Sequence, residues 1–316
     1  MINLDYQYSK KYNNTNEIDL IDNSIYFFTY SAEERSHIIN NLKIKYCNVS
    51  FIEIKKDDNK KDVIIDNYLN KLHSLRSEND MQSLIGNYNS SVIYIDTTGL
   101  DNRIVASLLR NAVLLSQKRE LKIFIIYAEP YSYIIPQFKL EGVYNDLSEK
   151  IEGIEPLPGF ANLVPNTDEV KFVALLGFEG GRFTYIKESV LPPDDSIIPV
   201  IGVPGFRPEY PFVALWGNRI TLEKTGAWDD IRYVTANSIV DIYFLLKKIL
   251  KEIPDKFKLL VAPIGTKPHA IGAMLFALKF PKQVEVVYDN PKRKINRTEG
   301  IGKIVVCDIN LLIRDN

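Results

Sequence analysis

The stretch that decides the fold is Lys258–Leu278, KLLVAPIGTKPHAIGAMLFAL. An apolar strand runs into the turn Gly265-Thr266-Lys267-Pro268 and continues into a helix rich in small and apolar residues. Strand, turn and helix N-terminus together direct backbone N–H groups and a positive dipole end at one point, and Lys267 adds a full charge. This geometry favours a phosphate-bearing ligand. The alternative is structural: Gly265 makes the turn, Pro268 takes its favoured first helical position and Lys267 is solvated.

Length and composition place the chain among ordinary globular proteins. Its 316 residues are 46% hydrophobic and 25% charged, enough for a sizeable core and about two domains. The formal net charge of −1 gives no general basic field, so we expect no bulk binding of double-stranded nucleic acid. Cys47 and Cys307 lie far apart without CxxC spacing. This spacing argues against a zinc site or a disulfide framework and fits a reducing cytosol.

The N-terminus predicts a cytoplasmic protein. Its first residues, MINLDYQYSKKYNNTN, are polar and lack the apolar core of a signal peptide. No apolar run approaches the ~18 residues that a membrane helix requires. We therefore expect neither export nor a membrane span.

Residues 1–150 predict a first Rossmann-like unit. Short runs rich in Ile, Val, Phe and Tyr alternate with helical patterns, as in a parallel sheet covered on both faces. The expected strands are Ser24–Tyr30, Val49–Ile54, Ser91–Asp96 and Leu121–Tyr127, and the expected helices are Glu33–Leu42, Asp62–Leu75 and Arg103–Gln117.

A Gly- and Pro-rich connection, residues 151–170 with Gly153–Pro165 at its centre, excludes a long helix or a central strand. A second Rossmann-like unit, residues 171–316, follows it. The fold class predicted for the whole chain is therefore α/β, with two tandem Rossmann-like units and mostly parallel sheets. The second unit's expected strands are Lys171–Gly177, Ile197–Val203, Leu259–Ala262, Val284–Tyr288 and Lys303–Asp308, and its main helix is Ser238–Lys251.

The two series correspond in element order. The first loop of each, Ser31–Arg35 and Phe178–Arg182, offers both Glu and Arg. A later loop of each, Asp96–Leu100 and Pro263–Lys267, leads from a strand into a helix through a glycine. We interpret this as a diverged internal duplication. The alternative is that any two α/β units show such echoes.

The strand, the turn Gly265-Thr266-Lys267 and the small-residue helix resemble the signature of the CRISPR-associated Rossmann-fold (CARF) sensor domains. In that family the turn meets the phosphates of a cyclic oligonucleotide across a two-fold dimer interface. Two such units in one polypeptide resemble the SAVED sensor arrangement of bacterial antiviral signalling. The family commonly carries two adjacent glycines in the turn, and this chain has Ile264 in place of the first. We expect that side chain to stand where bare backbone would admit a ligand.

Open α/β sheets bind ligands beyond the carboxyl ends of their strands, where all the candidate loops lie. Arg binds phosphate through its planar fork and Lys adds a point charge, so we expect cations from both units to converge on one cleft. The alternative for the two first-loop arginines is pairing with Glu33, Glu34 or Glu179. The predicted ligand-binding residues are Gly265, Thr266, Lys267, Arg35, Arg182, Thr98, Gly99 and Arg207.

Two further segments have open interpretations. In Val203–Tyr210, Phe206, Arg207 and Tyr210 could form an aromatic platform with a cation for a base, or a Pro-stiffened loop packed on the core. The segment from Trp216 to Trp228 interrupts the expected α/β pattern. It reads as an insertion that serves as a lid, as a partner surface or as core filling.

Evidence for catalysis is confined to one histidine. His269 falls in the first turn of the phosphate-site helix, where it could act as an acid or base, or have no duty at all. The chain has no Walker A run, no GxGxxG after its first strand, no HExxH and no GxSxG. These absences argue against the familiar NTPases, dehydrogenases, zincins and hydrolases, and we predict no metal and no cofactor.

The resemblance implies a nucleotide-sensing protein in antiviral defence. It would bind a phosphate-rich ligand, such as a cyclic oligonucleotide, between its two units and signal to an effector on another chain. Two alternatives stay open. One is an enzyme that cleaves a nucleotide or cyclic oligonucleotide without a metal, with His269 or Thr266 near the reacting phosphate. The other is a scaffold subunit of a defence complex that binds no ligand.

Overall fold

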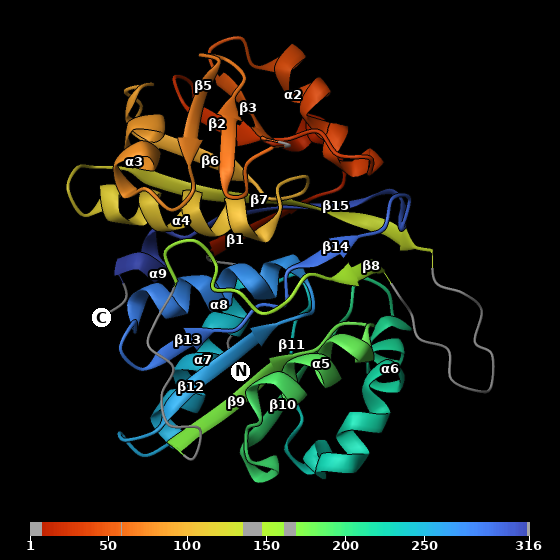
Figure 1. Cartoon of the computed structure of the whole chain (residues 1–316). Coiled ribbons are helices and arrows are strands. Elements are labelled where there is room, and N and C mark those ends of the chain that lie inside the picture. Colours follow the sequence, from red (N-terminus) through yellow and green to blue (C-terminus); the bar gives the residue numbers. More distant parts are fainter. Residues whose placement is uncertain (1–7, 58, 135–146, 161–168, 315–316) are drawn as a thin grey trace. The chain divides into compact units, whose positions relative to one another are not determined.

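The computed structural model describes residues 8–57, 59–134, 147–160 and 169–314. The chain forms two compact units (Figure 1). Unit 1 comprises Met1–Tyr133 and Thr298–Asn316, and unit 2 comprises Ile134–Arg297. Each unit is a β-sheet with helices packed on it, so the predicted α/β class is confirmed.

Unit 2 is built on a parallel sheet of five strands in the order β11-β10-β9-β12-β13. The chain starts in the middle at β9, moves outward to β11 and returns to the other side at β12. This order is doubly wound, and its topological switch point lies between β9 and β12. The strands are β9 Val170–Leu175, β10 Ile197–Gly202, β11 Arg232–Val234, β12 Lys258–Pro263 and β13 Val284–Val286.

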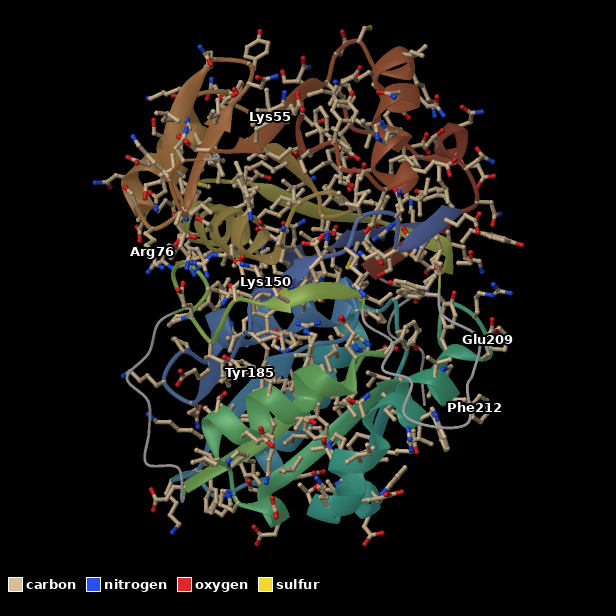
Figure 2. All side chains as sticks on the ribbon, turned by 45° about the vertical axis from the view of Figure 1, so that its right-hand side comes forward. Lys55, Arg76, Lys150, Tyr185, Glu209 and Phe212 are labelled. Atoms are coloured by element: carbon tan, nitrogen blue, oxygen red, sulfur yellow. The ribbon has the colours of Figure 1, made fainter. Side chains whose placement is uncertain are left out.

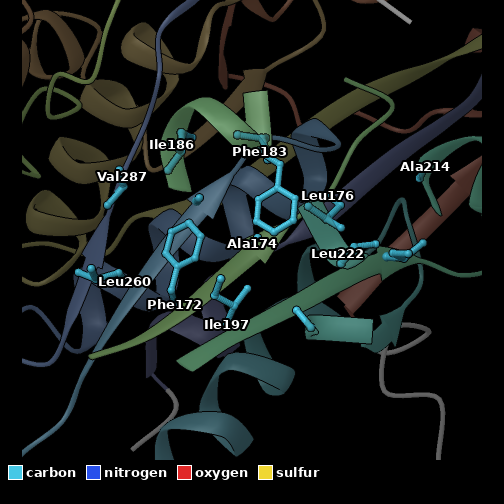
Figure 3. Packing of buried hydrophobic residues seen from close by; sticks show 14 of the residues in the cluster. Phe172, Ala174, Leu176, Phe183, Ile186, Ile197, Ala214, Leu222, Leu260 and Val287 are labelled. Atoms are coloured by element: carbon cyan, nitrogen blue, oxygen red, sulfur yellow. The ribbon is translucent and has the colours of Figure 1, made fainter. Parts of the chain in front are cut away.

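Helices pack in pairs on the sheet of unit 2, α5 with α6 and α7 with α8. Phe172, Ala174 and Leu176 alternate along β9 and its end, so they share one face, where they join Phe183 of α5 in a buried cluster (Figure 3). The helices are α5 Gly180–Val190, α6 Tyr210–Thr225, α7 Ile239–Glu252 and α8 Lys267–Lys279, with short 3-10 helices η4 Asp194–Ser196 and η5 Ala227–Asp230. A separate antiparallel pair joins β8 Ser148–Ile151 to β14 Pro291–Arg293.

Unit 1 has a mixed sheet of eight strands in the order β1-β15-β7-β6-β2-β3-β4-β5. Its centre, β7-β6-β2-β3, is parallel, and the strands added on both sides are antiparallel. The strands are β1 Ser9–Tyr12, β2 Ile25–Phe28, β3 Ser50–Lys56, β4 Val63–Asp66, β5 Lys71–Ser74, β6 Val92–Asp96, β7 Lys122–Tyr133 and β15 Thr298–Asp308. The helical segments are η1 Thr15–Glu17, η2 Glu34–Ile38, α2 Ile39–Lys45, α3 Glu78–Gly86, α4 Asn102–Ser116 and α9 Asn310–Arg314.

The helix predicted at Asp62–Leu75 is wrong. The segment forms the antiparallel hairpin β4–β5, and the helix of this region, α3, starts only at Glu78. The β-branched run Val63-Ile64-Ile65 suits a strand, and Asn70 takes a left-handed φ of 50° in the turn, which ends any helix. The spacing of apolar residues in this stretch fits a helix and a hairpin equally. The turn at Asn70 is what makes the segment a hairpin.

The strand expected at Lys303–Asp308 exists but belongs to the other sheet. It is part of β15, which pairs antiparallel with β7 and β1 in unit 1. Residues 298–316, predicted to close the second unit, therefore return to the first. An apolar strand pattern indicates burial but not the neighbour that provides it.

The segment from Trp216 to Trp228 is not an insertion. It covers the second half of α6 and enters η5, which connect β10 to the parallel strand β11. A parallel pair needs such a crossover, so this segment is a regular part of the α/β pattern. The Gly- and Pro-rich stretch Gly153–Pro165 has no helix or strand over its described residues, and residues 161–165 lie outside the described residues.

Candidate functional site

At the switch point of unit 2, the loops after β9 and β12 touch backbone to backbone. A Cβ added to Gly265 would lie 2.6 Å from the carbonyl oxygen of Leu176, and one added to Gly177 would lie 2.8 Å from that of Ile264. Each glycine is thus needed for the other loop to approach. The space left by the missing side chain of Gly265 is filled by the backbone of Leu176, so on that side of the turn it does not admit a ligand.

Ile264 does not stand in the path of a ligand. Its side chain is buried in the hydrophobic core of unit 2 and joins the cluster with Phe172 and Phe183. The obstruction expected from this residue is therefore absent, because the side chain points inward. The departure from two adjacent glycines leaves the outer side of the turn unchanged.

The N-terminus of α8 offers a narrow anion site. Thr266 is its N-cap: the hydroxyl accepts a hydrogen bond from the His269 N–H and donates one to the carbonyl of Ala236, at 2.7 Å. Pro268 has no N–H to offer. An anion at this point would meet the dipole end of α8, the backbone of Lys267 and the half-buried side chain of Lys267 at the first helical position.

His269 lies inside the protein. Its side chain is fully buried, and Nε2 lies 3.0 Å from the carbonyl oxygen of Thr235. Burial lowers the pKa of His269 to about 4, against a smaller opposite effect of the Thr235 hydrogen bond. The ring is therefore neutral, and Nε2 carries the proton that Thr235 accepts. Nδ1 has no hydrogen-bond partner among the described residues.

Arg182 is occupied within unit 2. From the first turn of α5 it donates through Nε and Nη2 to both carboxylate oxygens of Asp289, at 2.7 and 2.6 Å, and through Nη1 to the carbonyl of Ile264, at 2.9 Å. Burial disfavours its charge, yet the hydrogen bonds and charge of Asp289 hold the pKa of Arg182 above its ordinary value. The guanidinium thus spans the end of β12.

A second ion pair extends this network toward the surface. Glu179, the residue before α5, lies 3.5 Å from Nη1 of Arg182 and accepts a hydrogen bond from Nη1 of Arg293 at 2.7 Å. Glu179 and Asp289 are both buried. The charges of the two carboxylates and the two guanidinium groups cancel. Arg182 is therefore paired inside unit 2, which is the alternative to ligand binding that the sequence left open.

Arg207 is the exposed cation on the neighbouring loop, between β10 and α6. Its Nε lies 2.9 Å from a carboxylate oxygen of Glu209, in an ion pair open to solvent. Tyr210 is buried and packs edge-on against Phe178, with ring centroids 5.1 Å apart. The Tyr210 ring therefore serves packing, and Arg207 stands outside it.

The arginine that follows the first strand of unit 1 is also paired internally. Arg35, in η2 after β2, donates from Nε to Glu33 at 2.6 Å and from Nη1 to the carbonyl of Ala128 at 2.8 Å. Its guanidinium lies over the ring of Tyr127, 5.3 Å from the centroid. Arg35 is buried, and its ion pair with Glu33 is again the internal pairing considered from the sequence.

The loop after β6 in unit 1 is also closed by internal contacts. A Cβ on Gly99 would lie 2.1 Å from the carbonyl oxygen of Thr29, the residue directly after β2. The Thr98 N–H donates to Asp96, and the Thr98 hydroxyl accepts from the N–H of Ala128 at 3.0 Å. Asp96 also accepts the Tyr26 hydroxyl at 2.9 Å. Thr98 and Gly99 therefore hold the strand ends together.

One contact recurs in both units. In each, a glycine after the switch-point strand, Gly99 or Gly265, packs on the carbonyl one residue beyond the first strand, Thr29 or Leu176. The arginines after the first strands reach different places: Arg35 donates to the carbonyl of Ala128 within β7, and Arg182 donates to that of Ile264, directly after β12. The internal duplication stays a prediction.

Sequence reasoning missed Asp289 as the partner of Arg182. The signal was present, because Tyr288-Asp289-Asn290 follows a strand at the same edge of the sheet as the loop that holds Arg182. Among the described residues, no group of three or more His, Cys, Asp or Glu side chains could hold a metal ion, and no helix is long and apolar enough to cross a membrane. No protein-family model and no curated protein matches the chain.

Proposed function

We propose that the protein is a nucleotide sensor that binds a phosphate group of a nucleotide, such as a cyclic oligonucleotide, at the switch point of unit 2. The observation that carries the proposal is the position of Lys267. It is the first residue of α8, which begins directly after β12, and the turn before it is partly exposed. Ligands of doubly wound sheets bind at this point.

Because Arg35 and Arg182 are paired within their own units, fewer residues are candidates for the phosphate contact. Arg35 and Arg182 are buried and hold carboxylates of their own units. Lys267 is half-buried at the N-terminus of α8, where its charge adds to the helix dipole, so we assign the phosphate contact to it. Arg207, exposed on the adjacent loop, is the second cation that a longer ligand could reach. A site of this kind depends on one lysine and a helix dipole, and we expect modest affinity for a single phosphate.

Binding without cleavage is the favoured form of this function. An acid or base must reach the reacting phosphate, and His269 is fully buried with its Nε2 bonded to Thr235. The Thr266 hydroxyl is bonded to Ala236 and caps the helix. These contacts support a sensor over the phosphodiesterase considered from the sequence.

The wider setting of the proposal comes from the resemblance to CARF and SAVED sensors. It assigns the protein to antiviral signalling in the cytoplasm, where an effector on another chain would respond to occupancy. Neither Cys47 nor Cys307 forms a disulfide bond, which is in keeping with a reducing compartment.

The test is ligand binding to the whole chain. Melting temperatures are measured against a panel of cyclic di-, tri- and tetranucleotides, and any hit is titrated by calorimetry. Lys267→Ala should weaken a hit by about 10- to 100-fold, the effect of losing a hydrogen bond to a charged group. Lys248→Ala is the matched control, because this lysine on α7 is 74% exposed and pairs only weakly with Glu252, at 3.7 Å.

Three outcomes decide. A panel without any shift contradicts the sensor, and so does a hit that Lys267→Ala leaves unchanged. Chromatography of the nucleotide after incubation should recover it intact. Product that appears with the wild type would replace the sensor by the cleaving enzyme.

A further inference from the structure

The two units differ at the helix that begins beside each switch point. In unit 2, α8 follows β12 and has the uncharged Thr266 as its N-cap and Lys267 as its first residue. In unit 1 the strand order changes direction between β2 and β6, and α4 follows β6. The N-cap of α4 is Asp101 and its first residue is Asn102. The positive dipole end therefore lies beside a lysine in one unit and beside a carboxylate in the other.

The carboxylate of Asp101 is held against the end of α4. Its Oδ1 accepts a hydrogen bond from the N–H of Ile104 at 2.8 Å, and its Oδ2 forms an ion pair with Lys56 at the end of β3. Thr266 caps α8 through the same kind of hydrogen bond, but with a neutral hydroxyl. The two helix ends thus differ by one full negative charge, and a phosphate at the end of α4 would meet a like charge.

A second carboxylate lies at the end of β6. Asp96 is the last residue of this strand and is buried. It accepts hydrogen bonds from the Thr98 N–H and from the Tyr26 hydroxyl, each at 2.9 Å. The strand that ends at Asp96 and the helix that begins after Asp101 therefore both place a negative charge at the switch point of unit 1.

The arginines beside the start of α4 are bound by a third carboxylate, that of Asp62. Arg103, the second residue of α4, donates to it from Nε and Nη2, both at 2.6 Å, and Arg76 donates to it from Nε at 2.7 Å. Asp62 is 5% exposed, whereas Arg76 is 57% exposed and lies at the surface (Figure 2). Lys56, Arg76 and Arg103 are thus each held by a carboxylate of unit 1.

We propose that the nucleotide phosphate is bound by unit 2 alone, one per chain, and that the charge of Asp101 excludes a phosphate from the turn Gly99–Asp101 of unit 1. This inference rests on the proposed function, because it takes the phosphate contact of Lys267 as its starting point. The N-cap residue then determines which unit binds. A neutral threonine admits an anion to the end of α8, and a carboxylate keeps it from the end of α4.

Amide NMR of the isotope-labelled full chain, titrated with inorganic phosphate, observes both turns in one experiment. The amides of Gly265 and Lys267 should shift and saturate, and those of Gly99 and Asn102 should stay in place. Asp101→Asn keeps a good N-cap side chain, removes its charge and releases Lys56 from the ion pair. In this variant the Gly99 and Asn102 amides should respond as well, with phosphate bound at least about tenfold more tightly than by the same turn of the wild type.

Asp22→Asn is the matched control, because it removes the same charge at an exposed position of unit 1 and should leave the Gly99 and Asn102 amides in place. The inference is overturned if both turns of the wild type respond alike, or if Asp22→Asn acts like Asp101→Asn. It is also overturned if the unit 1 turn of Asp101→Asn stays silent while Lys267 responds. In all three cases the sensor stands. A chain in which neither turn responds contradicts the nucleotide site of unit 2, and this inference with it.

Discussion

Arg182 and Asp289 are joined by two parallel hydrogen bonds, Nε to Oδ2 at 2.7 Å and Nη2 to Oδ1 at 2.6 Å. They come from α5 and from the loop after β13, with the end of β12 between them. Because both side chains are buried, the pair fixes three neighbouring strand ends of unit 2 relative to one another. The carboxyl edge that presents the candidate site is thus rigid at its centre.

Breaking this pair from one side should be costly. Arg182→Met leaves the buried carboxylate of Asp289 without its fork and should lower the free energy of unfolding by about 3–5 kcal/mol. Urea unfolding followed by tryptophan fluorescence measures it, and the signal reports unit 2 alone, because both tryptophans, Trp216 and Trp228, lie there.

Two controls separate charge burial from general damage. Arg232→Ala breaks a solvent-exposed ion pair with Asp230 and should cost less than about 1 kcal/mol. The double variant Arg182→Met with Asp289→Leu removes both charges and should recover part of the loss. If the single variant unfolds like the wild type, the pair has no structural role and Arg182 returns as a ligand candidate.

Adjacent glycines in α5 should respond in opposite directions. A Cβ on Gly180 would lie 1.9 Å from the carbonyl oxygen of Gly217 in α6, so Gly180→Ala should cost about 1–3 kcal/mol. Gly181 has nothing within 4 Å of its Cβ position, and Gly181→Ala should stabilise by up to about 1 kcal/mol through helix propensity. The same fluorescence assay measures both, and equal effects would refute the close contact of the two helices.

Gly99 and Gly265, the glycines at the switch points of the two units, should be required for the close contact between neighbouring loops. Gly99→Ala and Gly265→Ala each force a methyl group against a backbone carbonyl, at 2.1 and 2.6 Å, and should each lower stability by about 1–3 kcal/mol. Gly86→Ala, where the Cβ position has open space, is the control. Unfolding of unit 1 variants is followed by circular dichroism. A Gly265→Ala variant of unchanged stability would indicate that this glycine serves a ligand instead.

The sequence predicts the strands whose pattern is local and fails where the structure depends on a turn conformation or on a partner distant in the chain. The parallel core strands were predicted close to their observed bounds, because a strand such as β6, Val92–Asp96, is buried on both faces and reads as a continuous apolar run. The hairpin β4–β5 was missed, because the left-handed turn at Asn70 cannot be read from apolar spacing. The sheet that β15 joins was missed for a different reason: its partner β7 is distant in sequence.

The candidate site shows the same limit. The Gly265-Thr266-Lys267 turn could be placed at a helix start, because Thr266 and Pro268 are local N-terminal signals, and the structure has them at the N-cap and in the first turn. Which of the candidate cations are held in buried ion pairs could not be predicted. Arg35 and Arg182 bind Ala128 and Asp289, partners 93 and 107 residues away, so only the folded chain shows that they are occupied.

The buried His269 should make unit 2 sensitive to acid. Its pKa in the folded protein is about 4, against about 6.5 in an unfolded chain, so the unfolded state binds more protons between these values. Stability is therefore complete above about pH 6.5 and falls as the pH drops toward 4, by at most about 3 kcal/mol. Urea midpoints from tryptophan fluorescence at a series of pH values measure the slope. His269→Gln should flatten it in this window, whereas His37→Gln, at an exposed histidine of unit 1, should not. An unaltered slope in His269→Gln would mean that other groups carry the acid sensitivity and that His269 is not held neutral by burial.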